Sequence, residues 1–100
     1  MFCLLLIRPK LKSEENRKAL WENFDIIDMI ASDHAPHTLE EKQKKGLPGF
    51  PGLETSLALL ITAYKQGKLT LETIIQKCYK NPLKIFNLPE QEDTYIEIGK

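Results

Sequence analysis

The sequence predicts an α/β architecture, because apolar strand-like segments alternate with amphipathic helical segments along the chain. The predicted order is strand, helix, strand, loop, helix, helix, strand. The second strand is a nearly continuous apolar run, which is typical of a strand buried on both faces of a parallel sheet. Because two parallel strands do not make a stable sheet alone, we expect this sheet to need strands from elsewhere.

The N-terminal part of the chain predicts a strand, a helix and a second strand. Cys3 to Ile7 is apolar, and Pro9 ends this first strand because proline cannot donate to a ladder. Ser13 is a good N-cap, and the two acidic residues that follow it favour the positive end of a helix that runs to about Asn23. The apolar run from Asp25 to Ser32 predicts the second strand.

A long segment rich in turn-forming residues, residues 33–52, separates the second strand from the helices that follow. Its first part is polar and contains two histidines, and its last part is dense in glycine and proline, which interrupt regular structure. The charged stretch Glu40 to Lys45 lies between these parts. We interpret that stretch as a solvated face.

Two helices are predicted after this loop, over residues 53–66 and 70–80, because apolar residues recur there at helical spacing. Asn81-Pro82 is predicted to end the second helix, since the residue before a proline disfavours helical geometry, and Pro82 is predicted to open a short turn through Phe86. A weakly alternating strand over residues 94–98 follows a short linker. The chain shows no internal repeat.

Composition and charge narrow the class of protein. Hydrophobic residues make up 42% and charged residues 28%, as in ordinary soluble domains. The 14 basic residues balance the 14 acidic ones, so no basic face for nucleic acid is expected. The apolar start is too short to span a bilayer and does not resemble a signal peptide, so no membrane partner is expected. Cys3 and Cys78 are typical of reduced thiols, and we expect a cytoplasmic protein.

Asp33 is the strongest candidate for chemistry, because it follows the predicted second strand and opens the polar loop. Functional groups of α/β folds lie at the carboxyl ends of strands. Asp33, His34 and His37 bring an oxygen and two imidazoles into one small volume if the loop folds back. A turn-forming aspartate with ordinary loop histidines explains the same pattern equally well. A hydrolytic metal site also needs about three or more protein ligands, and one loop does not offer a convincing set.

A resemblance to a known family extends this interpretation. Residues 31–42 read ASDHAPHTLEEK, and this run strongly resembles the signature near the end of dihydroorotases, members of the amidohydrolase superfamily. The resemblance continues through residues 48–55, reaches Asn81-Pro82 and residues 91–95, and extends back to Arg8-Pro9. The resemblance therefore covers nearly the whole chain. In particular, the chain is similar to the dihydroorotase domain of the multifunctional pyrimidine-synthesis proteins of animals. The Asp-His-Ala-Pro-His loop is its most specific part.

The resemblance implies a fold and a reaction. The fold is a TIM-like (β/α)8 barrel of the metal-dependent hydrolase type. Residues 1–100 would form part of the dihydroorotase domain: the last barrel strands, a substrate loop over 33–52, and C-terminal helices over 53–66 and 70–80. The reaction is the reversible cyclisation of N-carbamoyl-L-aspartate to dihydroorotate in de novo pyrimidine (UMP) biosynthesis, with a binuclear zinc site. The implied partners are the rest of a larger pyrimidine-synthesis polypeptide and further copies in a homo-oligomer.

The resemblance also implies residue roles. Asp33 would be the acidic metal ligand of the last barrel strand and would transfer a proton to and from the ring nitrogen of the substrate. His37 and Arg8 would contact the substrate, whose carboxylate suits the planar fork of an arginine. Pro48 and Gly49 would contact it through the backbone, since glycine allows close approach of main chain to a ligand. The structural alternatives are a loop histidine, a solvated arginine and a plain turn.

Much of the family's metal site has no counterpart in this sequence. The paired histidines of the first strand, the metal-bridging lysine and the middle-strand histidines are absent, and a complete barrel needs about 250 residues. We therefore expect the isolated chain to be inactive and poorly folded. Two alternatives stay open: a non-catalytic barrel remnant that acts as an assembly or interaction piece, and an amidohydrolase that acts on another cyclic amide.

Overall fold

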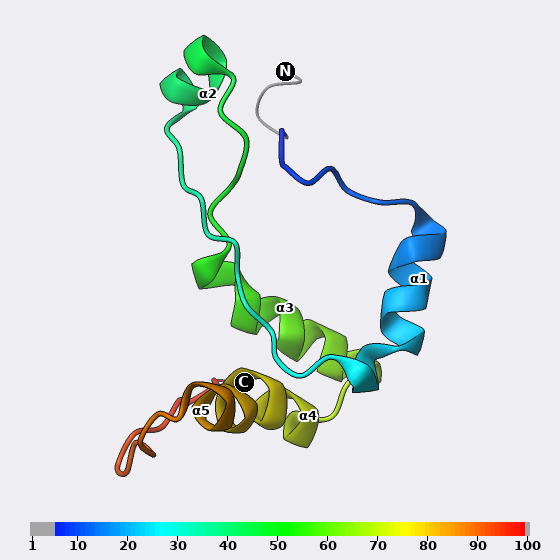
Figure 1. The fold of residues 1–100 in the computed structure, drawn as a ribbon, viewed down its shortest axis with the longest axis vertical. Coiled ribbons are helices and arrows are strands. Elements are labelled where there is room, and N and C mark those ends of the chain that lie inside the picture. Colours follow the sequence, from blue (N-terminus) through cyan, green and yellow to red (C-terminus); the bar gives the residue numbers. More distant parts are fainter. Residues whose placement is uncertain (1–5, 100) are drawn as a thin grey trace.

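The computed structural model describes residues 6–99, and the regular elements of this range are helices. Figure 1 shows α2 far from the group formed by α3, α4 and α5, with α1 to one side. The radius of gyration, 16.2 Å, exceeds the value of about 13 Å typical of a compact domain of 100 residues, so the arrangement is open. The elements in chain order are α1 (Glu14–Glu22), the 3-10 turn η1 (Phe24–Ile26), α2 (Leu39–Lys45), α3 (Leu53–Lys65), α4 (Leu71–Ile75), the π-helical turn η2 (Gln76–Lys80) and α5 (Asn81–Phe86).

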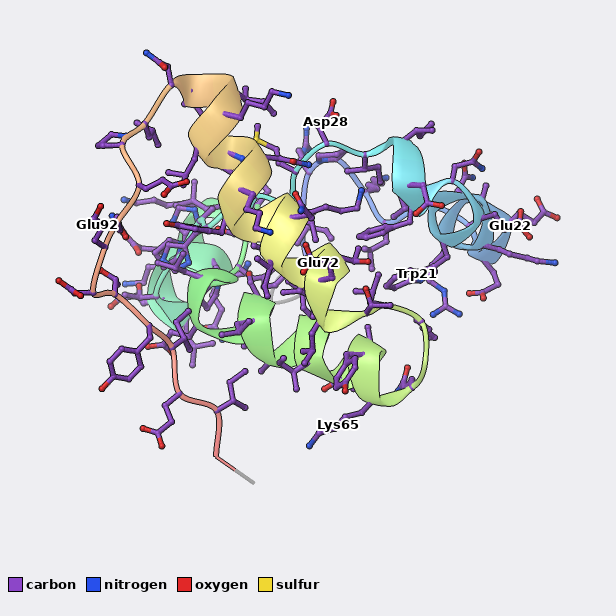
Figure 2. The ribbon with its side chains drawn as sticks, turned by 90° about the horizontal axis from the view of Figure 1, so that it is seen from below. Trp21, Glu22, Asp28, Lys65, Glu72 and Glu92 are labelled. Atoms are coloured by element: carbon purple, nitrogen blue, oxygen red, sulfur yellow. The ribbon has the colours of Figure 1, made fainter. Side chains whose placement is uncertain are left out.

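Helix α1 forms where the sequence predicts it. The Ser13 hydroxyl accepts a hydrogen bond from the backbone N–H of Asn16, which satisfies one of the free donors at the helix start. On its inner side, Trp21 stacks on Phe24 with ring centroids 5.3 Å apart. Figure 2 shows the Trp21 side chain between α1 and the loop that joins α3 to α4. This aromatic pair attaches α1 to the rest of the molecule.

The predicted strands differ from what the structure shows for residues 6–99. Ile27 is extended, with φ −81° and ψ 121°, but the segment that follows it is not paired with another strand. The segment predicted as a strand over residues 94–98 is also unpaired. The first predicted strand, Cys3 to Ile7, lies mostly outside the described residues. An extended segment becomes a strand when a neighbour supplies the ladder, and here no such neighbour is present within residues 6–99.

The helix predicted over 53–66 is present as α3, whereas the predicted loop over 33–52 contains a helix that the sequence reasoning did not predict. The charged stretch Glu40 to Lys45 belongs to α2, which begins with a capping box between Thr38 and Glu41. Hydrogen bonds from the Thr38 backbone and hydroxyl lower the pKa of Glu41. The short turn predicted from Pro82 to Phe86 is present as α5, which follows η2 without a break because Pro82 occupies its first turn, where no backbone donor is required.

The buried core is small. Ala63 of α3, Leu69 of the following loop and Ile74 of α4 are its buried members, and residues from α1, η1 and α3 pack against them. Helix α3 is apolar on more than one side, because Leu53 and Leu59 are exposed. A helix with this pattern is normally buried among several other elements. Among residues 6–99, no helix has the length and hydropathy required to cross a membrane.

Candidate functional site

A cavity of about 300 Å³ lies where three distant segments meet: the chain before α1, the end of the second predicted strand, and the turn that leads into α3. Three of the five predicted site residues, Arg8, Asp33 and Gly49, line it. The structure therefore brings together residues that the sequence separates by up to about 40 positions. The other lining residues are Ile7, Pro9, Ser32, Phe50, Gly52, Thr55, Ser56 and Leu59.

Groups of opposite charge border this cavity. Arg8 contributes a guanidinium, and the first turn of α3, with Gly52 and Thr55, brings the positive end of the helix dipole to the cavity wall. Asp33 contributes a carboxylate, and both Arg8 and Asp33 are exposed to solvent. The positive side of the cavity favours anionic groups, and an exposed carboxylate such as that of Asp33 is a group type that can accept and return a proton.

Gly49 forms a wall of the cavity that tolerates no side chain. Its φ is +116°, and a Cβ built on it would lie 2.6 Å from the Cβ of Ala35. Its backbone N–H donates to the Leu6 carbonyl at 2.9 Å, and the Ala35 N–H donates to the Phe50 carbonyl at 3.2 Å. These bonds tie the turn both to the chain before Arg8 and to the chain after Asp33. Glycine is the residue that this backbone conformation and this close approach require.

Lys42 of α2 supports the same wall, a role that sequence reasoning missed. Its side chain is buried, with 5% of its surface exposed. Its ammonium donates to the Gly49 carbonyl and lies 3.5 Å from the Leu6 carbonyl. The capping box formed by Thr38 and Glu41 predicts α2 in principle, but the burial of Lys42 depends on chain segments distant in sequence.

His34 anchors the start of α3. Its Nδ1 accepts hydrogen bonds from the backbone N–H groups of Gly52, at 3.1 Å, and Leu53, at 3.2 Å. Only an imidazole whose Nδ1 carries no proton can accept them. Sequence reasoning left the role of His34 open, and the structure gives it a hydrogen-bonding one that fixes the helix start relative to Asp33.

Two predicted site residues do not line the cavity. His37 is half-buried beside α2, where its charge is one of the weaker causes that lower the pKa of Glu41, after the hydrogen bonds from Thr38. Pro48 is half-buried next to Gly49 but is not among the lining residues. Their proposed contacts with a substrate therefore depend on parts of the molecule other than this cavity.

The described residues do not form a metal centre by themselves. Within residues 6–99 there is no group of three or more histidine, cysteine, aspartate or glutamate side chains close enough to hold a metal ion. His34 already uses its Nδ1 to bind α3. Asp33 is thus a single candidate ligand, and a hydrolytic metal site needs about three from the protein.

Comparison with known proteins gives close relatives for nearly the whole chain. It is 61% identical over 93 residues to the multifunctional protein pyr1-3 of Dictyostelium discoideum and 53% identical over 93 residues to the multifunctional protein CAD of Squalus acanthias. Each match covers 92% of this chain and 4% of the relative. The chain is also 50% identical to the dihydroorotase of Pyrococcus furiosus over 97 residues, which cover 97% of this chain and 22% of that protein. No family model matches the sequence.

Proposed function

Since this chain is a dihydroorotase-like sequence over nearly its whole length, we propose that it supplies the C-terminal side of a dihydroorotase site. That site would reversibly cyclise N-carbamoyl-L-aspartate to dihydroorotate in pyrimidine biosynthesis. The observation that carries the proposal is the convergence of Arg8, Asp33 and Gly49 on one cavity. The family resemblance implies a role for each of these three residues. Their convergence on one cavity is a separate observation, because it depends on how the chain folds.

The charges of the cavity suit this reaction. The carboxylate that stays free in both the open and the closed substrate binds the guanidinium of Arg8. In cyclisation the carbamoyl nitrogen attacks the carbon of the protonated side-chain carboxyl group, a C–N bond forms, a C–O bond breaks and the hydroxyl leaves as water. Asp33 accepts the proton that the nitrogen loses and passes it to the leaving hydroxyl, and in hydrolysis it returns a proton to the ring nitrogen. The backbone at Gly49 limits where the substrate lies.

Zinc belongs to the proposal, with Asp33 as one of its ligands. The remaining ligands would come from parts of a dihydroorotase that this chain does not span, because residues 6–99 contain no group of three or more candidate ligands. When bound, zinc would supply activation of water and polarisation of the amide carbonyl. The residues of this chain would bind the carboxylate, orient the ring and move the proton.

The exposed apolar surfaces support placement inside a larger barrel domain. Leu53 and Leu59 of α3 and Ile85 and Phe86 of α5 are exposed. In a TIM-like barrel these helices would cover the sheet, which would bury such faces. We also propose that this barrel domain belongs to a larger cytoplasmic pyrimidine-synthesis polypeptide that forms a homo-oligomer. A non-catalytic assembly piece would use the same apolar surfaces. A measurement of activity therefore has to separate this alternative from the proposed dihydroorotase function.

A chimera tests the proposal. The matching 97 residues of the Pyrococcus furiosus dihydroorotase are replaced by this chain, and conversion of dihydroorotate is measured. We expect an active chimera, while the isolated chain converts no more dihydroorotate than its Asp33→Ala variant. A folded but inactive chimera would contradict the proposal and favour the assembly piece. Faster turnover of another cyclic amide, such as a hydantoin, would favour a different amidohydrolase.

Lys42→Met is expected to weaken substrate binding in this chimera. The substitution keeps an apolar stem of similar length but removes the donor to the Gly49 carbonyl, so the wall of the cavity can move. We expect KM for dihydroorotate to rise about tenfold with a smaller change in kcat, which is the pattern for loss of uniform binding. Lys45→Met is the matched control, because Lys45 is exposed on the same helix. Equal KM values for the two variants would remove Lys42 from the site.

A further inference from the structure

The chain segment that leads to Asp33 is held by a buried lysine of η2. The Lys77 side chain has 7% of its surface exposed. Its ammonium donates to the Ile27 carbonyl, lies 3.4 Å from the Asp25 carbonyl and stands 5.1 Å from the centroid of the Phe24 ring. These contacts join residues about 50 positions apart. Burial of an ammonium group costs little only when oxygens and an aromatic face surround it, and this segment provides both.

The backbone of Lys77 binds the same segment, and the π-helical turn makes this possible. In an α-helix the N–H of Asn81 would donate to the Lys77 carbonyl, but here it donates to the Gln76 carbonyl. The residue one position further along, Pro82, has no N–H. The Lys77 carbonyl therefore accepts from the Ile30 N–H instead, at 3.0 Å. A π-helical turn of this kind is frequent at functional sites.

Asn81 supplies the third attachment. Its side-chain amide donates to the Asp28 carbonyl at 2.7 Å. Figure 2 shows the segment through Asp28 running beside the rod formed by α4, η2 and α5. We call Lys77 and Asn81 together the η2 clamp. The clamp binds backbone atoms of residues 25–30, so it sets where this segment lies whatever its side chains are.

Resting on the proposed function, we infer that the η2 clamp consists of two positioning residues that set how far Asp33 reaches into the cavity. Neither Lys77 nor Asn81 lines the cavity, so both act through the segment they hold. The last attachment, at Ile30, lies three residue steps before Asp33, an extended length of about 10 Å. A displacement of this segment is therefore transmitted to the carboxylate, and a shift of about 1 Å at a reacting group can lower a rate about 100-fold.

The kinetic test uses the chimera described above. Lys77→Met and Asn81→Leu remove the two side-chain donors, and Lys80→Met is the matched control. Lys80 is on the same turn, but it is exposed and pairs with Glu72 at 3.2 Å, an interaction of little energetic weight. We expect kcat to fall about 10- to 100-fold in both clamp variants while KM changes less than about twofold, because Arg8 lies on a different segment. Lys77→Arg, which keeps a donor, should recover most of the loss.

Two controls separate positioning from a general loss of structure. Assays are run well below the melting temperature of every variant, so that the folded fraction does not limit the rate. Amide hydrogen exchange is also measured on peptides that cover residues 26–33, and we expect about tenfold faster exchange there in Lys77→Met but not in Lys80→Met. Unchanged exchange in this segment, or equal kcat in the clamp and control variants, would overturn the inference. The exchange measurement needs only a folded chimera. An inactive parent chimera would therefore contradict the proposed function, while the exchange measurement would still decide whether the clamp holds the segment.

Discussion

Asp33→Asn in the chimera is expected to abolish measurable turnover while leaving the fold intact. Asparagine has nearly the same size, but its amide cannot accept and return a proton, and general acid–base catalysis of this kind contributes about 10²–10⁴-fold to the rate. Asp33 is exposed, so the substitution removes no buried contact. The measurements are kcat for hydrolysis of dihydroorotate, kcat for cyclisation of N-carbamoyl-L-aspartate, and the melting temperature of the variant.

The control for this prediction is Asp28→Asn. Asp28 lies on the same segment and is also exposed, but its side chain does not line the cavity. The control should keep kcat within about twofold of the parent, since surface substitutions have small effects. Full activity of Asp33→Asn would remove Asp33 from the mechanism, and with it the proton transfer proposed above.

Gly49→Ala is expected to have the second-largest effect, through the shape of the cavity. The new methyl group would lie 2.6 Å from the Ala35 Cβ and 3.1 Å from the Ala35 carbonyl oxygen, and the φ of +116° is one that side chains rarely adopt. Both penalties act together, so we expect a loss of about 2–4 kcal/mol in the free energy of unfolding. We also expect KM for dihydroorotate to rise about tenfold or more, because the displaced turn carries one wall of the cavity.

Gly46→Ala separates the two causes. Gly46 also has a positive φ, +61°, but no atom lies within 4 Å of a Cβ built there. Its substitution should cost only the backbone strain, about 1 kcal/mol, and leave KM unchanged. The pair Ala35→Gly and Gly49→Ala should recover part of the loss, since it removes the closest contact but not the strain. If the Gly49→Ala and Gly46→Ala chimeras had the same melting temperature and the same KM, the close approach of Gly49 to Ala35 would not be needed.

The helices with clear local signals were predictable. Ser13 caps α1 through a contact three residues away, and the apolar spacing of α3 depends on that helix alone. The predicted strand over residues 25–32 shows the opposite case. Its apolar run indicates a segment that has to be buried, but a strand also needs a paired neighbour. Within residues 6–99, side chains of Lys77 and Asn81 bind the backbone of this segment instead of a neighbouring strand. The short turn predicted from Pro82 to Phe86 is present as α5, and the π-helical turn before it leaves Pro82 where no donor is required.

The sequence by itself determined which residues we propose for the chemistry of this protein, through its resemblance to dihydroorotases: a carboxylate after an apolar run, an arginine near the start, and a glycine turn. These are local patterns, and local patterns can be read without coordinates. Only the tertiary structure decided that Arg8, Asp33 and Gly49 share a cavity, that Lys42 and His34 bind residues of its wall, and that Lys77 binds the segment before Asp33. Such roles depend on which backbone carbonyls and N–H groups come within reach after folding, and residue identity alone does not specify them.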